Sequence, residues 1–235
     1  MSRAMKQLFD VPAAPMIPLL GEDAGVPVRR IFCVGRNYEA HARELGNTVQ
    51  RDAPIWFTKT PSAYCPSGAA IPYPPGTANC HYEMELVVAL GTPGFRVEPQ
   101  DALDLVLGYA CGLDMTRRDL QGAAREKGLP WDTGKDFENS AVIGPFTRAA
   151  RFGEPGAQRI TLALDGETRQ DAVLSDMIWP VRDLIAHIST LYHLEPGDLI
   201  FTGTPAGVGP VAPGNRLSGA IDGLAPVTLE ITAPE

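Results

Sequence analysis

The sequence predicts a β-rich α+β fold. Strand-sized apolar runs outnumber the segments of helical character, and Pro and Gly, 22 and 24 residues in all, recur between them as turn residues. A chain of 235 residues with 44% hydrophobic side chains is long enough for one sizeable core. We therefore expect a Pro/Gly-rich lead-in over residues 1–28, followed by a single domain over residues 29–235.

The lead-in contains four prolines between residues 12 and 27, so we expect an extended segment with a short strand or hairpin there. In the domain, nine segments have the length and composition of strands: residues 30–34, 55–58, 83–90, 106–113, 141–143, 160–164, 167–171, 199–202 and 227–231. Asp165 and Gly166 both tolerate positive φ, which predicts a tight hairpin between two of these strands.

Helices are expected over residues 36–45, 116–127 and 180–192. The last one begins with Pro180 in a first-turn position. Its apolar side chains fall on one helical face and comprise Val181, Leu184, Ile185, Ile188 and Leu191. We find no internal repeat that would indicate a solenoid or an array.

Composition and charge exclude several classes of partner. The net charge is −8, and no basic run could neutralise several phosphates, so nucleic acid is not an expected partner. The longest apolar stretches are strand-sized and the N-terminus lacks a signal-like apolar region, so we expect no membrane contact and a cytoplasmic location. The four cysteines form no C-x-x-C pair, and free thiols are expected.

Two glutamates open an otherwise apolar strand. Glu83 and Glu85 would point to the same face of that strand, roughly 6.6 Å apart at about 3.3 Å per residue. Two unpaired buried carboxylates repel each other, and a divalent cation such as Mg²⁺ or Mn²⁺ relieves that conflict. The alternative is an exposed strand end with two solvated acids.

A third carboxylate, Asp114, ends the apolar strand over residues 106–113. It either caps the helix that follows or supplies a further oxygen ligand to the same cation. Arg118 and Gln121, three residues apart on that helix, are suited to hold an anionic or dioxo substrate, although ordinary helix-surface polarity has the same pattern.

His41 and Glu44 are three apart on a short predicted helix. A carboxylate beside an imidazole fixes its tautomer and raises its basicity, which suits a general base for water, but such pairs also occur on solvated helices. Lys135 follows Pro130-Trp131 and could donate to a developing oxyanion or enolate. The alternative is a surface lysine paired with a nearby aspartate.

Taken together, these segments resemble the fumarylacetoacetate hydrolase family in its short bacterial form, from about residue 30 to residue 232. The matching pieces are Gly35-Arg36-Asn37-Tyr38 with His41 and Glu44, the H-x-E-x-E of His81, Glu83 and Glu85, the D-M-T-x-R-D-x-Q of residues 114–121, Pro130-Trp131 leading to Lys135, and residues 197–209. The resemblance implies a catalytic domain with a mixed β-roll, usually a homodimer, that acts on a small 2,4-dioxo acid. It further implies Mg²⁺ or Mn²⁺ held by Glu83, Glu85 and Asp114.

Two departures from the family pattern limit which residue roles can be transferred from the family to this chain. Long members have a fourth carboxylate seven residues before the histidine, where this chain has Val34, and the usual Lys-Pro pair is here Lys59-Thr60-Pro61, which leaves the role of Lys59 open. The glycine-rich residues 203–209 lack the P-loop and dinucleotide patterns, so we assign them to backbone shaping beside the substrate. Arg36, Asn37 and Thr204 are the other expected substrate contacts.

Residues 130–142 are most similar to family members of the gentisate route, which implies hydrolysis of a carbon–carbon bond in an acylpyruvate. Fumarylpyruvate, giving fumarate and pyruvate, is the expected substrate. His41, oriented by Glu44, would activate the water, and Lys135 would stabilise the departing enolate. The alternatives are oxaloacetate decarboxylation or dienol isomerisation on the same metal site, and, from another class, a noncatalytic domain that the metal stabilises.

Overall fold

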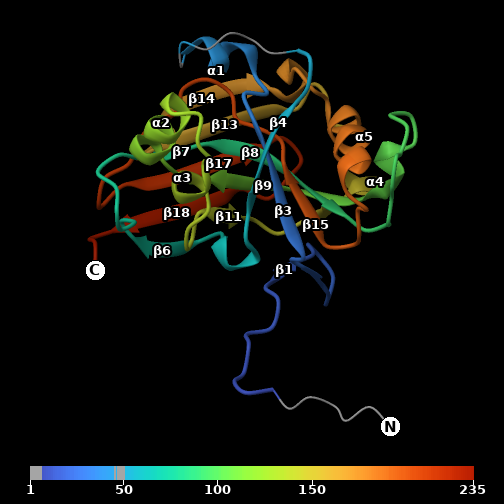
Figure 1. The fold of residues 1–235 in the computed structure, drawn as a ribbon, viewed down its shortest axis with the longest axis horizontal. Helices are drawn as coiled ribbons and strands as arrows, with labels where there is room; N and C mark the ends of the chain where they lie inside the picture. The colour runs from blue at the N-terminus through green and yellow to red at the C-terminus, as the bar shows by residue number, and fades with distance from the viewer. Residues whose placement is uncertain (1–6, 45, 47–50) are drawn as a thin grey trace.

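The largest sheet collects strands from almost the whole length of the chain (Figure 1). The structure is a computed structural model and describes residues 7–44, 46 and 51–235. In this part of the chain, an eight-stranded sheet has the order β4-β3-β15-β8-β9-β11-β5, with β12 paired to β9. Its strands are β3 (Arg30–Gly35), β4 (Ile55–Lys59), β5 (Tyr64–Pro66), β8 (Met84–Leu90), β9 (Val106–Asp114), β11 (Ala141–Ile143), β12 (Thr147–Arg148) and β15 (Asp198–Phe201). β15 is parallel to β3 and β11 is parallel to β5, so the sheet is mixed.

A second sheet of five strands has the order β14-β13-β17-β18-β6. Its strands are β6 (Ala69–Pro72), β13 (Arg159–Leu164), β14 (Glu167–Val173), β17 (Arg216–Ile221) and β18 (Val227–Thr232). Two small sheets complete the described β structure, formed by β1 (Met16–Pro18) with β2 (Gly25–Pro27), and by β7 (Cys80–Tyr82) with β10 (Thr116–Arg117) and β16 (Gly209–Pro210).

The main hydrophobic core joins the two large sheets. Leu86 and Val88 of β8 pack in one cluster with Leu162 of β13 and Leu229 of β18. The alternate residues of β8 face a second apolar cluster on the other side of the sheet, so every residue of this strand is buried. Because Glu85 lies on β8, its carboxylate is carried into a buried position by the packing of its apolar neighbours.

Helices lie around the sheets. They are α1 (Glu39–Glu44), α2 (Arg118–Glu126), α3 (Asp132–Lys135), α4 (Ala149–Phe152) and α5 (Val181–Leu191), with short 3₁₀ turns η1 (Pro61–Ala63), η2 (Ala102–Leu105) and η3 (Leu174–Asp176). Helix α5 buries the predicted apolar face except at its last residue, Leu191, which is exposed. No described helix combines the length and the apolar content that crossing a membrane requires.

All nine predicted strands are present, with ends that differ by up to two residues. The lead-in forms the β1–β2 hairpin, and all four cysteines are free. Asp165 and Gly166 form the predicted turn between β13 and β14, with φ of 52° and 86°. Strand β17 was not predicted, because its alternation depends on small residues such as Gly219 that carry little strand signal.

All three predicted helices are shorter than expected. The helix predicted over residues 180–192 loses one residue at each end, and Pro180 is its N-cap rather than a first-turn residue. The helix predicted over residues 36–45 begins at Glu39, because Arg36 has a left-handed φ of 60° that interrupts a helix; residue 45 lies outside the described residues. The helix predicted over residues 116–127 begins at Arg118, because Thr116 and Arg117 pair with β7 instead.

Candidate metal centre and active-site cavity

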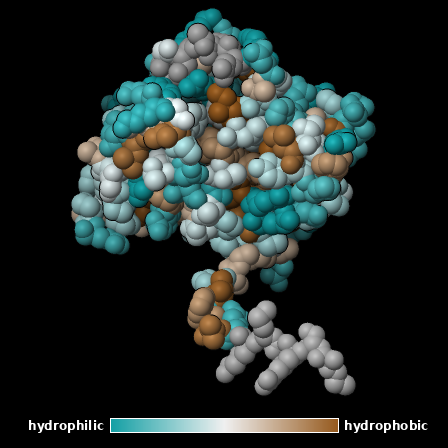
Figure 2. Space-filling view, viewed as in Figure 1, coloured by the Kyte–Doolittle hydropathy of each residue, from teal (hydrophilic) through white to brown (hydrophobic). Residues whose placement is uncertain are grey.

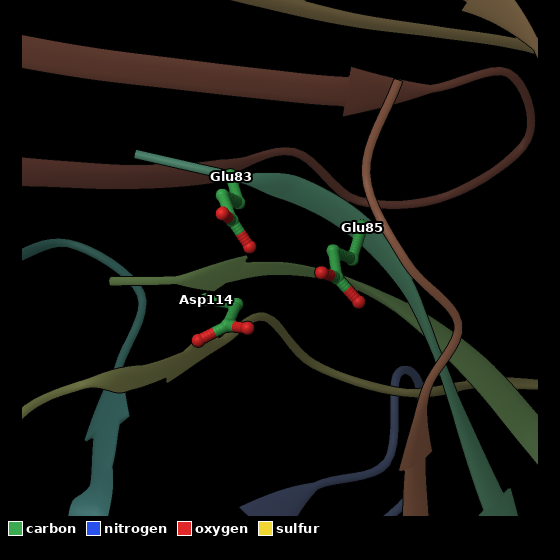
Figure 3. Close-up of side chains that lie close together, drawn as sticks. All are labelled: Glu83, Glu85 and Asp114. Carbon is green, nitrogen blue, oxygen red and sulfur yellow. The ribbon is translucent and has the colours of Figure 1, made fainter. Parts of the chain in front are cut away.

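Three carboxylates converge at the paired ends of β8 and β9. Glu83 immediately precedes β8, Glu85 lies within it, and Asp114 is the last residue of β9, where its backbone N–H donates to Glu83 O at 2.9 Å. One carboxylate oxygen of each residue lies within 4.8 Å of the others, and all three residues are at most 5% exposed (Figure 3). The alternative of an exposed strand end with solvated acids therefore does not describe this pair.

The three acids experience different electrostatic surroundings. Burial, together with the neighbouring Asp114 and Glu83 carboxylates, raises the pKa of Glu85 well above its usual range. Burial would also raise the pKa of Glu83, but the ammonium of Lys135 and the guanidinium of Arg118 outweigh it and hold that pKa well below its usual range. Without a cation, the surroundings of Glu85 therefore favour its protonated form.

Two buried lysines lie against the triad. Lys135 Nζ donates to Glu83 Oε2 and to Asp114 Oδ2, both at 2.7 Å, and Lys135 is only 2% exposed. Lys59 Nζ lies 2.9 Å from Asp114 Oδ1 and donates to Ser140 Oγ at 2.9 Å. The alternative of a surface lysine is thus excluded for Lys135, and Lys59, whose role was left open, lies directly beneath the acidic site.

The donor set fits a hard divalent cation. All three side chains offer oxygen, and three protein ligands leave coordination positions for water and substrate. Asp114 Oδ1 is buried and accepts no well-oriented hydrogen bond, even though Lys59 is close, and Asp114 does not cap α2. A bound Mg²⁺ or Mn²⁺ would coordinate the orphaned Asp114 oxygen and would stabilise the ionised form of Glu85, which burial and the neighbouring acids disfavour.

A histidine with a carboxylate partner opens onto the same cavity. His41 Nδ1 lies 3.1 Å from Glu44 Oε2, and Glu44 Oε1 accepts a hydrogen bond from Gly207 N at 3.0 Å. A carboxylate only accepts, so Nδ1 carries the hydrogen and Nε2 keeps its lone pair. Burial lowers the pKa of His41 despite the opposing effects of Glu83 and Glu44, so the imidazole is neutral and able to accept a proton at pH 7.

One cavity of about 230 Å³ brings together most of the candidate residues. Of the residues identified from sequence, those that line it are Arg36, His41, Glu83, Glu85, Arg118, Gln121, Lys135 and Thr204. Glu44 lies behind His41 and Asp114 lies beneath Lys135, outside the lining. Arg118 donates to both Gln121 and Glu83, so it links helix α2 to the acidic site.

The glycine-rich loop contacts the triad through its backbone. Gly203 N donates to Glu85 Oε2 at 2.6 Å. Gly203 has a φ of 93°, and a Cβ on it would lie 2.7 Å from Asn37 Cβ, so only glycine fits here. The next residue, Thr204, lines the cavity, and its hydroxyl accepts from Gln170 Nε2 at 2.8 Å.

Asn37 is placed differently from the sequence expectation. It is fully buried and does not line the cavity. Its amide nitrogen donates to the carbonyls of Trp179 and Thr202, and its oxygen accepts from Trp179 N at 2.8 Å. Because these bonds occupy the side chain, Asn37 anchors the turn that carries Arg36 rather than reaching a substrate.

Sequence reasoning missed several residues at the site. Gln170 is fully buried and also accepts from Met84 N at 3.0 Å, which fixes the start of β8, but an isolated glutamine in a strand gave no signal. Arg125 lines the cavity, and its spacing of seven from Arg118 could have placed it on the same face of α2. Phe57 and Trp131 also line it.

A mixed β fold with a buried carboxylate triad beside a cavity that also holds a glutamate-paired histidine defines the protein as a metal-dependent enzyme of the β-rich α+β class. The chain belongs to the fumarylacetoacetate hydrolase family: the family model described as "Fumarylacetoacetate (FAA) hydrolase C-terminal" matches residues 30–232. This confirms both the resemblance inferred from sequence and the expected fold class.

Proteins that are named for an enzymatic activity are similar to this chain over most of its length. A fumarylpyruvate hydrolase from Ralstonia sp is 51% identical over 194 residues, which is 81% of this chain and 100% of the relative. The human mitochondrial oxaloacetate tautomerase FAHD1 is 40% identical and covers 88% of this chain and 93% of its own. The crystal structure of fumarylpyruvate hydrolase from Pseudomonas aeruginosa in complex with Mn²⁺ and pyruvate has a TM-score of 0.93 and 45% identity, covering 97% of this chain and 100% of that one.

Proposed function

We propose that this protein is a metal-dependent acylpyruvate hydrolase, with fumarylpyruvate as its substrate and fumarate and pyruvate as its products. The observation that carries the proposal is the position of His41: an imidazole held by Glu44 opens onto the same cavity as Glu83 and Glu85, two of the three carboxylates of the triad. A similar protein in Ralstonia sp is a fumarylpyruvate hydrolase, and a similar structure from Pseudomonas aeruginosa contains Mn²⁺ and pyruvate.

The side chains of the cavity divide the reaction between them. A divalent cation held by Glu83, Glu85 and Asp114 would supply Lewis acidity toward a dioxo-acid substrate. His41 Nε2 takes a proton from water, and the resulting hydroxide adds to the 4-carbonyl carbon. The C3–C4 bond then breaks, its electron pair forms the enolate of pyruvate, and protonation at C3 yields pyruvate. The acyl fragment leaves as a carboxylic acid, so one water is consumed and no redox partner is needed.

Lys135 is the cation best placed to stabilise the developing enolate. Burial would lower the pKa of its ammonium, but the neighbouring Asp114 and Glu83 carboxylates outweigh that effect and raise it. The group therefore stays charged at pH 7 and lines the cavity. Arg118 and Gln121 lie beside it on α2 and are suited to the oxygens of the dioxo acid. Thr204 offers a further hydroxyl from the opposite loop.

A second candidate is oxaloacetate tautomerisation, which is favoured by the 40% identity to human oxaloacetate tautomerase FAHD1. That reaction also passes through an enolate and uses a base, but no water attacks a carbonyl carbon. Oxaloacetate decarboxylation and dienol isomerisation also require an enolate to be stabilised at the metal site formed by the triad. A hydrolase therefore differs from all of these in its need for a base directed at water.

The proposal extends to the state of the protein in the cell. Four free cysteines suit a reducing compartment such as the cytoplasm. Residues 7–15 run away from the body of the molecule (Figure 1), and Figure 2 shows apolar residues along this segment. Leu8, Phe9 and Val11 are 92%, 74% and 65% exposed. An apolar arm of this kind is suited to pack against a second copy in a homodimer. Residues 29–235 act as one catalytic domain.

The decisive experiment is a substrate panel with and without the base. Purified protein with Mg²⁺ or Mn²⁺ is given fumarylpyruvate, other acylpyruvates and oxaloacetate, and pyruvate and oxaloacetate tautomers are followed. Hydrolysis of acylpyruvates is expected, and His41→Ala should reduce it by a factor on the order of 10² or more while metal affinity is retained. Full turnover in His41→Ala, or oxaloacetate as the only compound transformed, would contradict the proposal.

A further inference from the structure

The cavity is a passage with two walls, and each wall leads from the acidic site to an arginine. On one side, helix α2 presents Arg118, Gly122 and Arg125 at spacings of four and three, so they share a face that lines the cavity. Arg118 contacts Glu83 at the inner end, and Arg125 lies two turns further along the helix, about 10 Å away at 1.5 Å per residue. Gly122 keeps the space between them open.

The opposite wall is aromatic. Lys135 Nζ lies 5.0 Å from the centre of the Phe57 ring, and the Phe57 and Trp131 rings lie 5.9 Å apart. The guanidinium of Arg36 in turn lies 6.0 Å from the centre of the Trp131 ring. This wall therefore begins with Lys135 at the acidic site, continues with the two aromatic rings, and ends with Arg36 at the outer end.

The two outer arginines lack acidic partners. Among the described residues, neither Arg36 nor Arg125 forms an ion pair, although most other arginines of the chain do. Residues 1–6, 45 and 47–50 contain no Asp or Glu that could serve. Burial lowers the pKa of the Arg36 guanidinium, and the positive charge of Arg125 adds to this effect, so the two groups repel each other.

The backbone at Arg36 is held in an uncommon conformation that keeps this geometry. Its φ of 60° costs on the order of 1–3 kcal/mol for a residue other than glycine. The buried amide of Asn37 fixes the turn, and a Cβ on Gly35 would lie 3.1 Å from the Trp131 ring. Two cations placed together without an acid, one of them on a strained turn, indicate a receptor for an anion.

We propose that Arg36 and Arg125 bind a carboxylate at the far end of the acyl group, and so make the enzyme selective for acylpyruvates with an acidic tail. This inference rests on the proposed function and specifies its substrate class. In a fumaryl substrate the two terminal carboxylate carbons are separated by six bonds, roughly 7–8 Å in an extended chain. That span suits a passage with the acidic site at one end and two arginines at the other. The flat apolar carbons between them face Phe57 and Trp131.

The test compares two substrates that differ only at the tail. Fumarylpyruvate and its crotonyl analogue, which has a methyl group in place of the terminal carboxylate, are assayed with wild type, Arg36→Met, Arg125→Met and the double variant. The ratio of their kcat/KM values should fall about 10-fold or more in each single variant, because a charge-assisted hydrogen bond is lost. Arg36→Lys and Arg125→Lys should recover part of the ratio, since they keep the charge without the planar fork. Arg151→Met, an exposed arginine away from the cavity, is the matched control.

A binding measurement separates this inference from the proposed function. Metal-free protein is titrated calorimetrically with fumarate and with crotonate, and wild type should bind fumarate more tightly, by a margin that the double variant loses. If no acylpyruvate is hydrolysed but this margin is found, the proposed function fails and the tail receptor stands. Equal affinities in wild type, or a kcat/KM ratio within about twofold of wild type in the double variant, would overturn the receptor whether or not hydrolysis occurs.

Discussion

At the scale of single residues, two opposing influences set the pKa of His41, the proposed base. Burial lowers its pKa, while Glu83 and Glu44 raise it, and the net effect is a value below the usual 6.5. The neutral form is the one that accepts a proton from water. Activity should therefore be fully present at pH 7 and be lost as the pH falls through the lowered pKa of His41.

Glu44, the partner of His41, allows the direction of a pKa change to be predicted. Because Glu44 raises the pKa of His41, Glu44→Gln should lower it further and move the acid limb of the kcat/KM profile to lower pH. The plateau should also drop, because the imidazole loses the carboxylate that fixes its tautomer. Profiles of kcat/KM against pH for both proteins check this. An acid limb that stays in place or moves to higher pH would remove His41 as the titrating base.

Lys59 shows how a residue outside the cavity can support the acidic site. Its side chain is fully buried, with the ammonium 2.9 Å from Asp114 Oδ1. Lys59→Met removes one of the two ammonium groups that contact the buried Asp114 carboxylate and leaves only Lys135, so the free energy of unfolding of the metal-free protein should fall by up to about 3 kcal/mol. Urea unfolding measures this, and Asp114→Asn in the same chain should recover part of the loss.

The control for Lys59 is Lys127→Met, at an exposed lysine after α2, which should change the free energy of unfolding by no more than about 0.5 kcal/mol. A loss in Lys59→Met as small as in this control would mean that Asp114 does not depend on Lys59. A recovery in the double variant identifies the charge pair, rather than the lost packing of the lysine stem, as the cause.

At the scale of elements, most of the longer strands were predictable, whereas β17, the short strands and the order of the sheets were not. Apolar runs and turn residues located all nine predicted strands, and the local spacings of His41 with Glu44 and Arg118 with Gln121 gave real contacts. The approach of Lys59 to Asp114, 55 positions apart, depends on where β4 lies relative to β9. Sheet order and register set that distance, and neither leaves a local pattern in the sequence.

Helix α2 carries a glycine whose replacement should be favourable. Gly122 lies within the helix, and a Cβ on it would meet no atom within 4 Å. Gly122→Ala should raise the free energy of unfolding by about 0.5–1 kcal/mol, because alanine loses less backbone freedom in a helix. Thermal and urea unfolding measure the change.

Gly203→Ala is the contrasting variant, because its φ of 93° and the close approach of Asn37 leave no room for a methyl group. It should lower the free energy of unfolding, and it should also disturb the hydrogen bond to Glu85. If both variants shifted stability in the same direction, local backbone geometry would not be what distinguishes the two glycines.

At the scale of the whole molecule, the metal site and the hydrophobic core are largely independent. Apolar clusters pack on both faces of β8, while the triad occupies only the ends of β8 and β9. Without a metal, Lys59, Lys135 and Arg118 still lie against the acidic side chains and offset part of their charge. The fold therefore has two sources of stability that can be removed separately.

Chelation of the metal tests this separation. We expect the protein to keep its far-ultraviolet circular dichroism and to lose turnover, with thermal stability lowered only by the contribution of metal binding. That contribution is about 2.7 kcal/mol at a metal concentration of 100 times Kd, and Glu83→Gln should reduce it by weakening the site. Cooperative unfolding on chelation would instead identify the triad as a structural metal site that holds the fold together.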